Sequence, residues 1–224
     1  MSFETIQKEI DDGYELSRSV EEYIGWVDDC FEKLRNQCSS EEFHRSRVIK
    51  RLREEAFPLR IYLKENPDSF TNVQLKDGSQ NYDGTAQSKD ANFYLEFTCV
   101  KDGQFDLYQA KHLDKFGSAP ASGIDTNSLN SAIEEGQQLF GIPVYTGAEI
   151  ESVAKRTFEE IGKKIEKTYN ENTILIVAID SVSTGDDDNW ALFCINMLNT
   201  KVVSKFHSIY VVCYVSKNIL KLNI

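Results

Sequence analysis

The sequence lacks the features that mark secreted, membrane-spanning and disulfide-rich proteins. No apolar run approaches the roughly 18 residues of a transmembrane helix. The N-terminal residues lack the basic start and apolar stretch of a signal peptide. The five cysteines contain no C-x-x-C pair and all but Cys38 lie in apolar runs, so we expect buried free thiols rather than disulfides or a zinc site. These absences predict a cytoplasmic protein without membrane contact.

Positive charge is also scarce. The 224 residues include 25 Lys and Arg against 36 Asp and Glu, a net charge of −11 that argues against indiscriminate nucleic-acid binding. Hydrophobic residues at 41% and charged residues at 27% are typical of a globular protein. One basic run could hold a phosphate backbone, although it could equally form salt bridges with the acid-rich first helix. Its candidate nucleic-acid-binding residues are Arg45, Arg47, Lys50 and Arg51.

The first 66 residues carry a helical pattern. Apolar residues recur in steps of three and four over residues 3–38, which predicts one long helix with Gly13 and Ser17 as weak points. The same rhythm over residues 49–63 predicts a second helix, which Pro58 should kink or divide. We therefore expect a helical hairpin over residues 1–66, partly packed on the core, whose apolar seam would also suit a homodimer.

From residue 67 to 224 the pattern becomes that of an α/β core. Three β-like stretches joined by short polar connections predict antiparallel strands. Two later, almost continuously apolar stretches predict central parallel strands joined by a crossover helix. Residues 118–146 read as an insertion with one short helix. The expected strands are 70–75, 82–87, 92–100, 174–179 and 209–215, and the expected helices between them are 105–116, 150–165 and 188–198.

Two carboxylates in this core stand out. Asp83 begins the second strand, and Glu96 lies in the middle of the apolar third strand. A carboxylate inside a sheet is costly unless it is paired or binds a metal, and two on adjacent antiparallel strands can converge on one face. Mg²⁺ or Mn²⁺ would suit such oxygen ligands. The alternative is that both side chains simply face solvent, since Asp-Gly is also common turn chemistry.

The motifs around these carboxylates resemble those of the PD-(D/E)XK nucleases. An Asp followed, on the next strand, by Glu-x-Lys is their motif, and here the segments are Gln80-Asn81-Tyr82-Asp83-Gly84 and Leu95-Glu96-Phe97-Thr98. These segments, and the later run from Lys163-Lys164 to Tyr169, are similar to those of bacterial and phage-associated members. The resemblance implies a restriction-endonuclease-like mixed sheet, with three antiparallel and then parallel strands flanked by helices.

The resemblance also implies roles for individual residues. Asp83 and Glu96 would be metal ligands and catalytic carboxylates, the main-chain carbonyl of Phe97 a further ligand, and Glu55, less readily Glu54, an additional helical acid. The motif's lysine position is Thr98, which cannot supply a cation to orient water. Lys111 on the following helix, or Lys101, is the candidate substitute.

These observations predict a phosphodiester hydrolase that uses Mg²⁺ or Mn²⁺ to cleave DNA or RNA. The alternative is a non-catalytic binding protein with the same fold, a degenerate site and an acidic surface that engages a basic protein partner. Thr98 and the net charge of −11 favour the alternative, whereas the paired carboxylates favour the enzyme.

Overall fold

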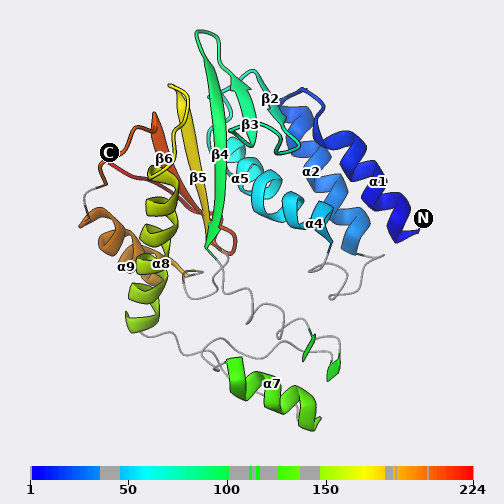
Figure 1. The fold of residues 1–224 in the computed structure, drawn as a ribbon, viewed down its shortest axis with the longest axis vertical. Helices are drawn as coiled ribbons and strands as arrows, with labels where there is room; N and C mark the ends of the chain where they lie inside the picture. The colour runs from blue at the N-terminus through cyan, green and yellow to red at the C-terminus, as the bar shows by residue number, and fades with distance from the viewer. Residues whose placement is uncertain are drawn as a thin grey trace.

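Figure 1 gives the arrangement of the chain in a computed structural model. Everything below refers to the residues that the structure describes, which are 2–35, 46–100, 111–112, 115–116, 126–136, 147–179, 184, 186–200 and 202–223.

A mixed sheet of seven strands forms the centre of the molecule, in the order β1 to β7. Strands β1 to β4 pair antiparallel, β4, β5 and β6 pair parallel, and β7 is antiparallel to β6. This confirms the predicted α/β class, with an antiparallel start followed by parallel strands. The strands are β1 (Arg18–Ser19), β2 (Asn72–Leu75), β3 (Gly84–Gln87), β4 (Asn92–Val100), β5 (Thr173–Ile179), β6 (Ser208–Cys213) and β7 (Ile219–Lys221).

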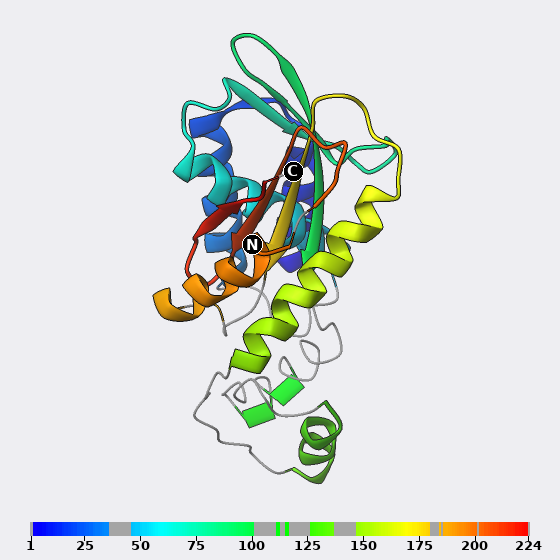
Figure 2. The same cartoon turned by 90° about the vertical axis from the view of Figure 1, so that its left-hand side faces the viewer.

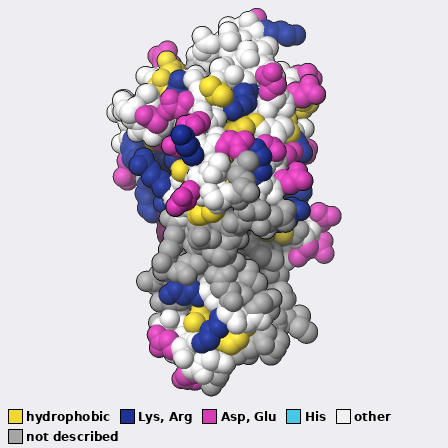
Figure 3. Space-filling model, turned by 90° about the vertical axis from the view of Figure 1, so that its right-hand side faces the viewer, with side chains coloured by type: hydrophobic (Ala, Val, Ile, Leu, Met, Phe, Trp, Pro, Cys, Tyr) yellow, Lys and Arg dark blue, Asp and Glu magenta, His cyan; other side chains and the backbone are white. Residues whose placement is uncertain are grey.

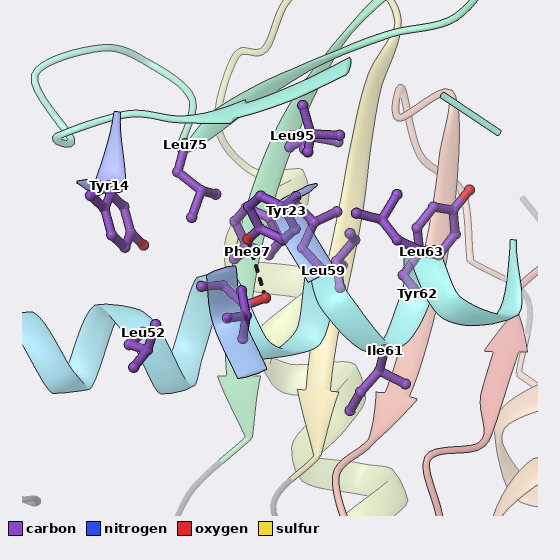
Figure 4. Close-up of a cluster of buried hydrophobic side chains, with 14 of the residues drawn as sticks. Tyr14, Tyr23, Leu52, Leu59, Ile61, Tyr62, Leu63, Leu75, Leu95 and Phe97 are labelled. Carbon is purple, nitrogen blue, oxygen red and sulfur yellow. Dashed lines mark hydrogen bonds between the residues drawn. The ribbon is translucent and has the colours of Figure 1, made fainter. Parts of the chain in front are cut away.

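Helices cover both faces of this sheet (Figure 1). The N-terminal helices share one core with β2, β4 and β5, and Figure 4 shows aromatic and aliphatic side chains interlocking there, with the Tyr23 hydroxyl donating to the Ala56 carbonyl at 3.2 Å. On the other face α8 and α9 bury the central strands (Figure 2). The helices are α1 (Phe3–Tyr14), α2 (Val20–Arg35), α4 (Arg47–Arg51), α5 (Phe57–Glu65), α7 (Thr126–Glu135), α8 (Gly147–Ile165) and α9 (Asp187–Leu198), with a π-helix η1 (Leu52–Ala56) between α4 and α5.

The prediction of one helix over residues 3–38 is wrong. The chain leaves α1 after Tyr14, forms β1 beside β2 and then starts α2. Gly13 allows this bend to pack tightly, because a Cβ there would lie 2.9 Å from the Trp26 indole nitrogen. The apolar rhythm continues through the break because α1 and α2 face the same core.

The apolar seam is buried within the chain. Ile6, Ile10, Val27 and Leu34 are at most 2% exposed, so intramolecular packing accounts for the pattern that suggested a homodimer.

The predicted division near Pro58 is confirmed in a specific form. A proline nitrogen cannot donate, so the usual helical bond to Glu54 is absent, and the preceding turn is the π-helix. The predicted helix over 105–116 lies outside the described residues, except for the helical residues 111–112 and 115–116. Within 118–146, the described segment holds α7. No described helix is long and apolar enough to cross a membrane.

Candidate functional site

Main-chain hydrogen bonds fix Asp83 beside the part of β4 that carries Glu96. The described β3–β4 pairing ends at Gly84 and Leu95, and the Asp83 amide just before β3 donates to the same Leu95 carbonyl at 2.9 Å. On its other side, the Asp83 carbonyl accepts from the Lys76 amide at 2.8 Å. Asp83 and Glu96 both line one hollow, so the predicted convergence of the two carboxylates is present.

The Asp83 carboxylate also closes the end of the β3–β4 ladder. Its Oδ2 accepts a hydrogen bond from the Phe97 amide at 2.8 Å, in the place where a further β3 carbonyl would stand. In an antiparallel strand the N–H and C=O of one residue point to the same neighbour. The Phe97 carbonyl is therefore directed toward the Asp83 edge, while the Phe97 side chain is buried in the opposite core.

Glu96 is buried and paired. Only 6% of the residue is exposed, and its Oε1 accepts from Lys164 Nζ at 2.5 Å and from the Tyr169 hydroxyl at 3.1 Å. Lys164 lies in the last turn of α8, which crosses the sheet face so that its C-terminal end reaches this position (Figure 2). An ammonium at a helix C-terminus is also favoured by the helix dipole.

The electrostatics confirm that the groups act on one another. Burial raises the pKa of Glu96 above its ordinary value, the negative charge of Asp83 raises it further, and Lys164 and Tyr169 lower it. Burial, and then the charge of Glu96, raise the pKa of the Tyr169 phenol, which therefore stays a hydrogen-bond donor. Shifts of this kind, in a cleft, are typical of functional sites, although structural ion pairs also produce them.

These side chains line an open hollow of about 420 Å³. Asp83 and Glu96 line it, together with Lys164, Lys167 and Tyr169 from the end of α8 and the loop after it. Tyr82, just before Asp83, also lines it. The described lysines that line the hollow are thus Lys164 and Lys167, whereas the predicted Lys111 lies elsewhere, half-buried in the helical residues 111–112.

Glu55 lies near this site but on the other side of the sheet. Its Oε2 accepts a hydrogen bond from the Tyr14 hydroxyl at 2.5 Å, and Arg51 Nε lies 3.9 Å away. Burial, and then the charge of Asp83, raise the pKa of Glu55 to about 7. The charge of Asp83 therefore acts on Glu55, whose hydrogen bond with Tyr14 ties η1 to α1.

The remaining predicted residues are distributed as follows. Thr98 is half-buried on the same side of β4 as Glu96. Arg47 and Lys50 are exposed on α4, and Arg45 lies outside the described residues. The Arg51 guanidinium stacks on the Tyr14 ring, 3.8 Å from its centroid, and donates to the Lys76 carbonyl. Arg51 therefore joins α4 to α1 and to the segment after β2.

On the face in Figure 3, acidic and basic side chains are interspersed.

The oxygen atoms of this site fit a hard cation, and Asp83 and Glu96 supply the two carboxylates among the described residues that line the hollow. Within the described ranges, no three His, Cys, Asp or Glu side chains come together as a metal site. The recorded bonds use Asp83 Oδ2 and Glu96 Oε1, so Asp83 Oδ1, Glu96 Oε2 and the Phe97 carbonyl are the oxygens suited to a ligand. Mg²⁺ commonly takes one or two carboxylates and completes its shell with water.

Sequence reasoning missed the roles of Lys164 and Tyr169. Both were within the run that carried part of the resemblance, but 68 residues separate Lys164 from Glu96, and nothing in their spacing indicates the contact. The signal that could have found Lys164 is its place in the last turn of an amphipathic helix that precedes a central strand.

No family model, curated protein sequence or solved structure matches the chain. The functional assignment therefore depends on the chemistry and geometry of its own residues.

Proposed function

We propose that the protein is a phosphodiester hydrolase that cleaves nucleic acid with Mg²⁺ or Mn²⁺. The observation that carries this proposal is that Asp83, Glu96 and the ammonium of Lys164 meet in one open hollow. Two acidic oxygen ligands beside a cation are what metal-assisted phosphodiester hydrolysis requires.

The topology supports the proposal. An antiparallel β2–β3–β4 unit is followed by a helix and by the parallel strand β5, and the carboxylates occupy the start of the β3 segment and the middle of β4. This is the arrangement that the resemblance to PD-(D/E)XK nucleases implies. Fold alone does not establish function, so the residues of the hollow have to supply the argument.

Asp83 Oδ1, Glu96 Oε2 and the Phe97 carbonyl are the atoms that would hold the cation. When bound, the metal would lower the pKa of a coordinated water and offset charge on the phosphate. The Phe97 amide keeps Asp83 in place through its bond to Oδ2, and the Tyr169 hydroxyl does the same for Glu96. The chain thus fixes both carboxylates before any ligand arrives.

Lys164 supplies the positive group that Thr98 cannot. Its Nζ is held at Glu96 Oε1, within the hollow that a phosphate would enter. There it can orient an attacking water or contact a phosphate oxygen. We therefore assign to Lys164 the role first expected of Lys111.

The contacts of Asp83 and Glu96 also favour a second function, that of a non-catalytic binding protein. Lys164 and Tyr169 already satisfy Glu96, and Asp83 already caps the Phe97 amide, so both carboxylates are stable without a metal. A protein with such a site could be a binding protein with a net charge of −11 that engages a basic protein partner.

Cleavage assays with matched variants distinguish the hydrolase from the binding protein. Single- and double-stranded DNA and RNA are incubated with Mn²⁺ and wild type, Asp83→Asn, Glu96→Gln, Lys164→Ala or Lys163→Ala. We expect the two carboxylate variants to lose cleavage and Lys164→Ala to lose roughly 10²-fold, the usual cost of a proton-handling group. Lys163, whose side chain is 67% exposed and pairs with Glu160, is the control and should leave the rate unchanged.

Cleavage that is equal in wild type and Asp83→Asn would identify a contaminant. That result, or no cleavage of any substrate by wild type, would contradict the enzyme and favour the binding protein.

A further inference from the structure

The antiparallel half of the sheet has a polar face beside the candidate site that is uncharged apart from Lys76, whose Nζ donates to Gln74 Oε1 at 2.8 Å. The register aligns Gln74, Thr85 and Tyr94 in one cross-strand row. Asn72, Gln87 and Asn92 form the next row outward. Because alternate residues of one strand project from the same face, Glu96 lies on the same face of β4 as Tyr94 and the side chains paired with it.

This face is open to ligands. Gln87 and Asn92 are exposed, and Asn72, Gln74, Thr85 and Tyr94 are half-buried. On this side of the sheet the described helices α8 and α9 pack over β4, β5 and β6, and Figure 2 shows the β3–β4 hairpin rising beyond the C-terminal end of α8. A hollow of about 380 Å³ lies over the uncovered strands.

The two hollows adjoin at Tyr82, which lines both. Its ring lies against that of Tyr94, with centroids 4.8 Å apart and planes inclined by 54°. An aromatic pair therefore stands where this polar face passes into the Asp83–Glu96–Lys164 site.

The chemistry of this face suits unpaired bases. Tyrosine rings can stack on bases of any sequence, and amide side chains can bond to base edges. The described residues that line the hollow carry no charge, in a chain whose net charge is −11. The described lining of this hollow therefore presents no carboxylate to a polyanion, and in the adjoining site Lys164 and Lys167 can contact its phosphates.

We propose that the face formed by β2, β3 and β4 binds single-stranded nucleic acid and directs its backbone into the Asp83–Glu96 hollow. This deepens the proposed function and rests on it, because it names the substrate class of the same site. A duplex, whose bases are already stacked, would not use Tyr82 and Tyr94 in this way.

Binding can be measured without cleavage. Fluorescence anisotropy on the full chain in EDTA would use labelled 15-nucleotide dT and rU strands and a 15-base-pair duplex. We expect both single strands, or one of them, to bind more tightly than the duplex, and the two strands to distinguish DNA from RNA. Tyr94→Ala should weaken binding about tenfold, since a stacked base contributes at that level, whereas Tyr94→Phe should retain it.

A second substitution avoids any loss of folding. Gln87→Glu adds a negative charge at an exposed position of the face and should weaken binding severalfold. Thr200→Glu, at an exposed position after α9, is its charge-matched control and should leave affinity unchanged. Tighter binding of the duplex, or equal affinities of wild type, Tyr94→Ala and Gln87→Glu, would overturn the inference.

A small diester distinguishes failure of this inference from failure of the proposed function. Hydrolysis of bis(p-nitrophenyl) phosphate with Mn²⁺ needs the metal site but not the sheet face. If wild type hydrolyses this diester without binding single strands, the inference fails and the hydrolase stands. If wild type binds single strands without hydrolysing either substrate, the hydrolase fails and the binding face stands.

Discussion

Glu55 illustrates how one half-buried carboxyl group contributes to the pH dependence of stability. Burial and the nearby Asp83 raise its pKa from 4.5 to about 7. Because the folded-state value is the higher one, the folded chain holds a proton that the unfolded chain has released. The resulting stabilisation is complete below pH 4.5 and is lost as the pH rises through about 7.

Glu55→Gln should therefore make the free energy of unfolding less dependent on pH. One pKa unit corresponds to about 1.4 kcal/mol, so the fall in stability between pH 4.5 and 8 should shrink by up to about 3 kcal/mol. Urea denaturation at the two pH values, in buffer without metal, measures this. Glu65→Gln, at the exposed end of α5, is the control, and an unchanged fall in Glu55→Gln would contradict the prediction.

The Lys164–Glu96 pair makes a second prediction at the residue scale. Their side chains are 18% and 8% exposed, so removing the ammonium leaves a largely buried carboxylate with Tyr169 as its remaining recorded donor. Lys164→Met should lower the free energy of unfolding at pH 7 by about 1–3 kcal/mol. The double variant Lys164→Met/Glu96→Gln should recover part of this loss, and urea denaturation of the full cycle measures the coupling. Additive losses would show that the two side chains do not interact.

At the scale of elements, the sequence could predict strands and helices that a local apolar pattern marks. It could not predict features that depend on contacts between residues far apart in the chain. The alternating and continuously apolar stretches located β2 to β6 and set Asp83 and Glu96 on neighbouring strands. The break between α1 and α2 was not predictable from the rhythm, because both helices face one core. The contact of Lys164 with Glu96, and that of Tyr14 with Glu55, join residues 68 and 41 positions apart.

The start of β3 depends on a glycine. A Cβ at Gly84 would lie 2.9 Å from the Gln74 carbonyl oxygen, which belongs to the backbone of β2 and cannot turn aside. Gly84→Ala should therefore lower the free energy of unfolding by about 1–3 kcal/mol and shift the adjacent Asp83. Gly25→Ala in α2, where nothing lies within 4 Å, should raise it by up to about 1 kcal/mol. Thermal and urea unfolding compare them, and equal effects would contradict the role of Gly84.

At the scale of the whole molecule, the parallel and the antiparallel halves of the sheet differ in how far their faces are covered. The parallel strands β5 and β6 are covered on both faces and hold the fold together, whereas the antiparallel strands keep one face open beside the hollow. The site lies at this boundary, with α8 supplying Lys164 from the covered half and β3–β4 supplying Asp83 and Glu96. Such a division allows a rigid core to fix the candidate site while a neighbouring surface remains open to a ligand.

Metal binding is the property of the whole chain that most directly tests this account. A ligand that binds only the folded state adds about 2.7 kcal/mol to the free energy of unfolding at 100 times its Kd. In a chain of 224 residues, about 2–4 °C per kcal/mol is expected, so saturating Mn²⁺ or Mg²⁺ should raise Tm by about 5 °C or more, and EDTA should reverse the rise. Asp83→Asn and Glu96→Gln should abolish the shift, because each removes a charged oxygen from the pair that would hold the cation. Asp90→Asn, at an exposed acid between β3 and β4, should keep it. An identical Tm shift in Asp83→Asn would place the metal elsewhere in the protein. No shift in wild type would show that the site binds no metal, and the partner of Glu96 would then be Lys164 alone among the groups proposed to neutralise its charge.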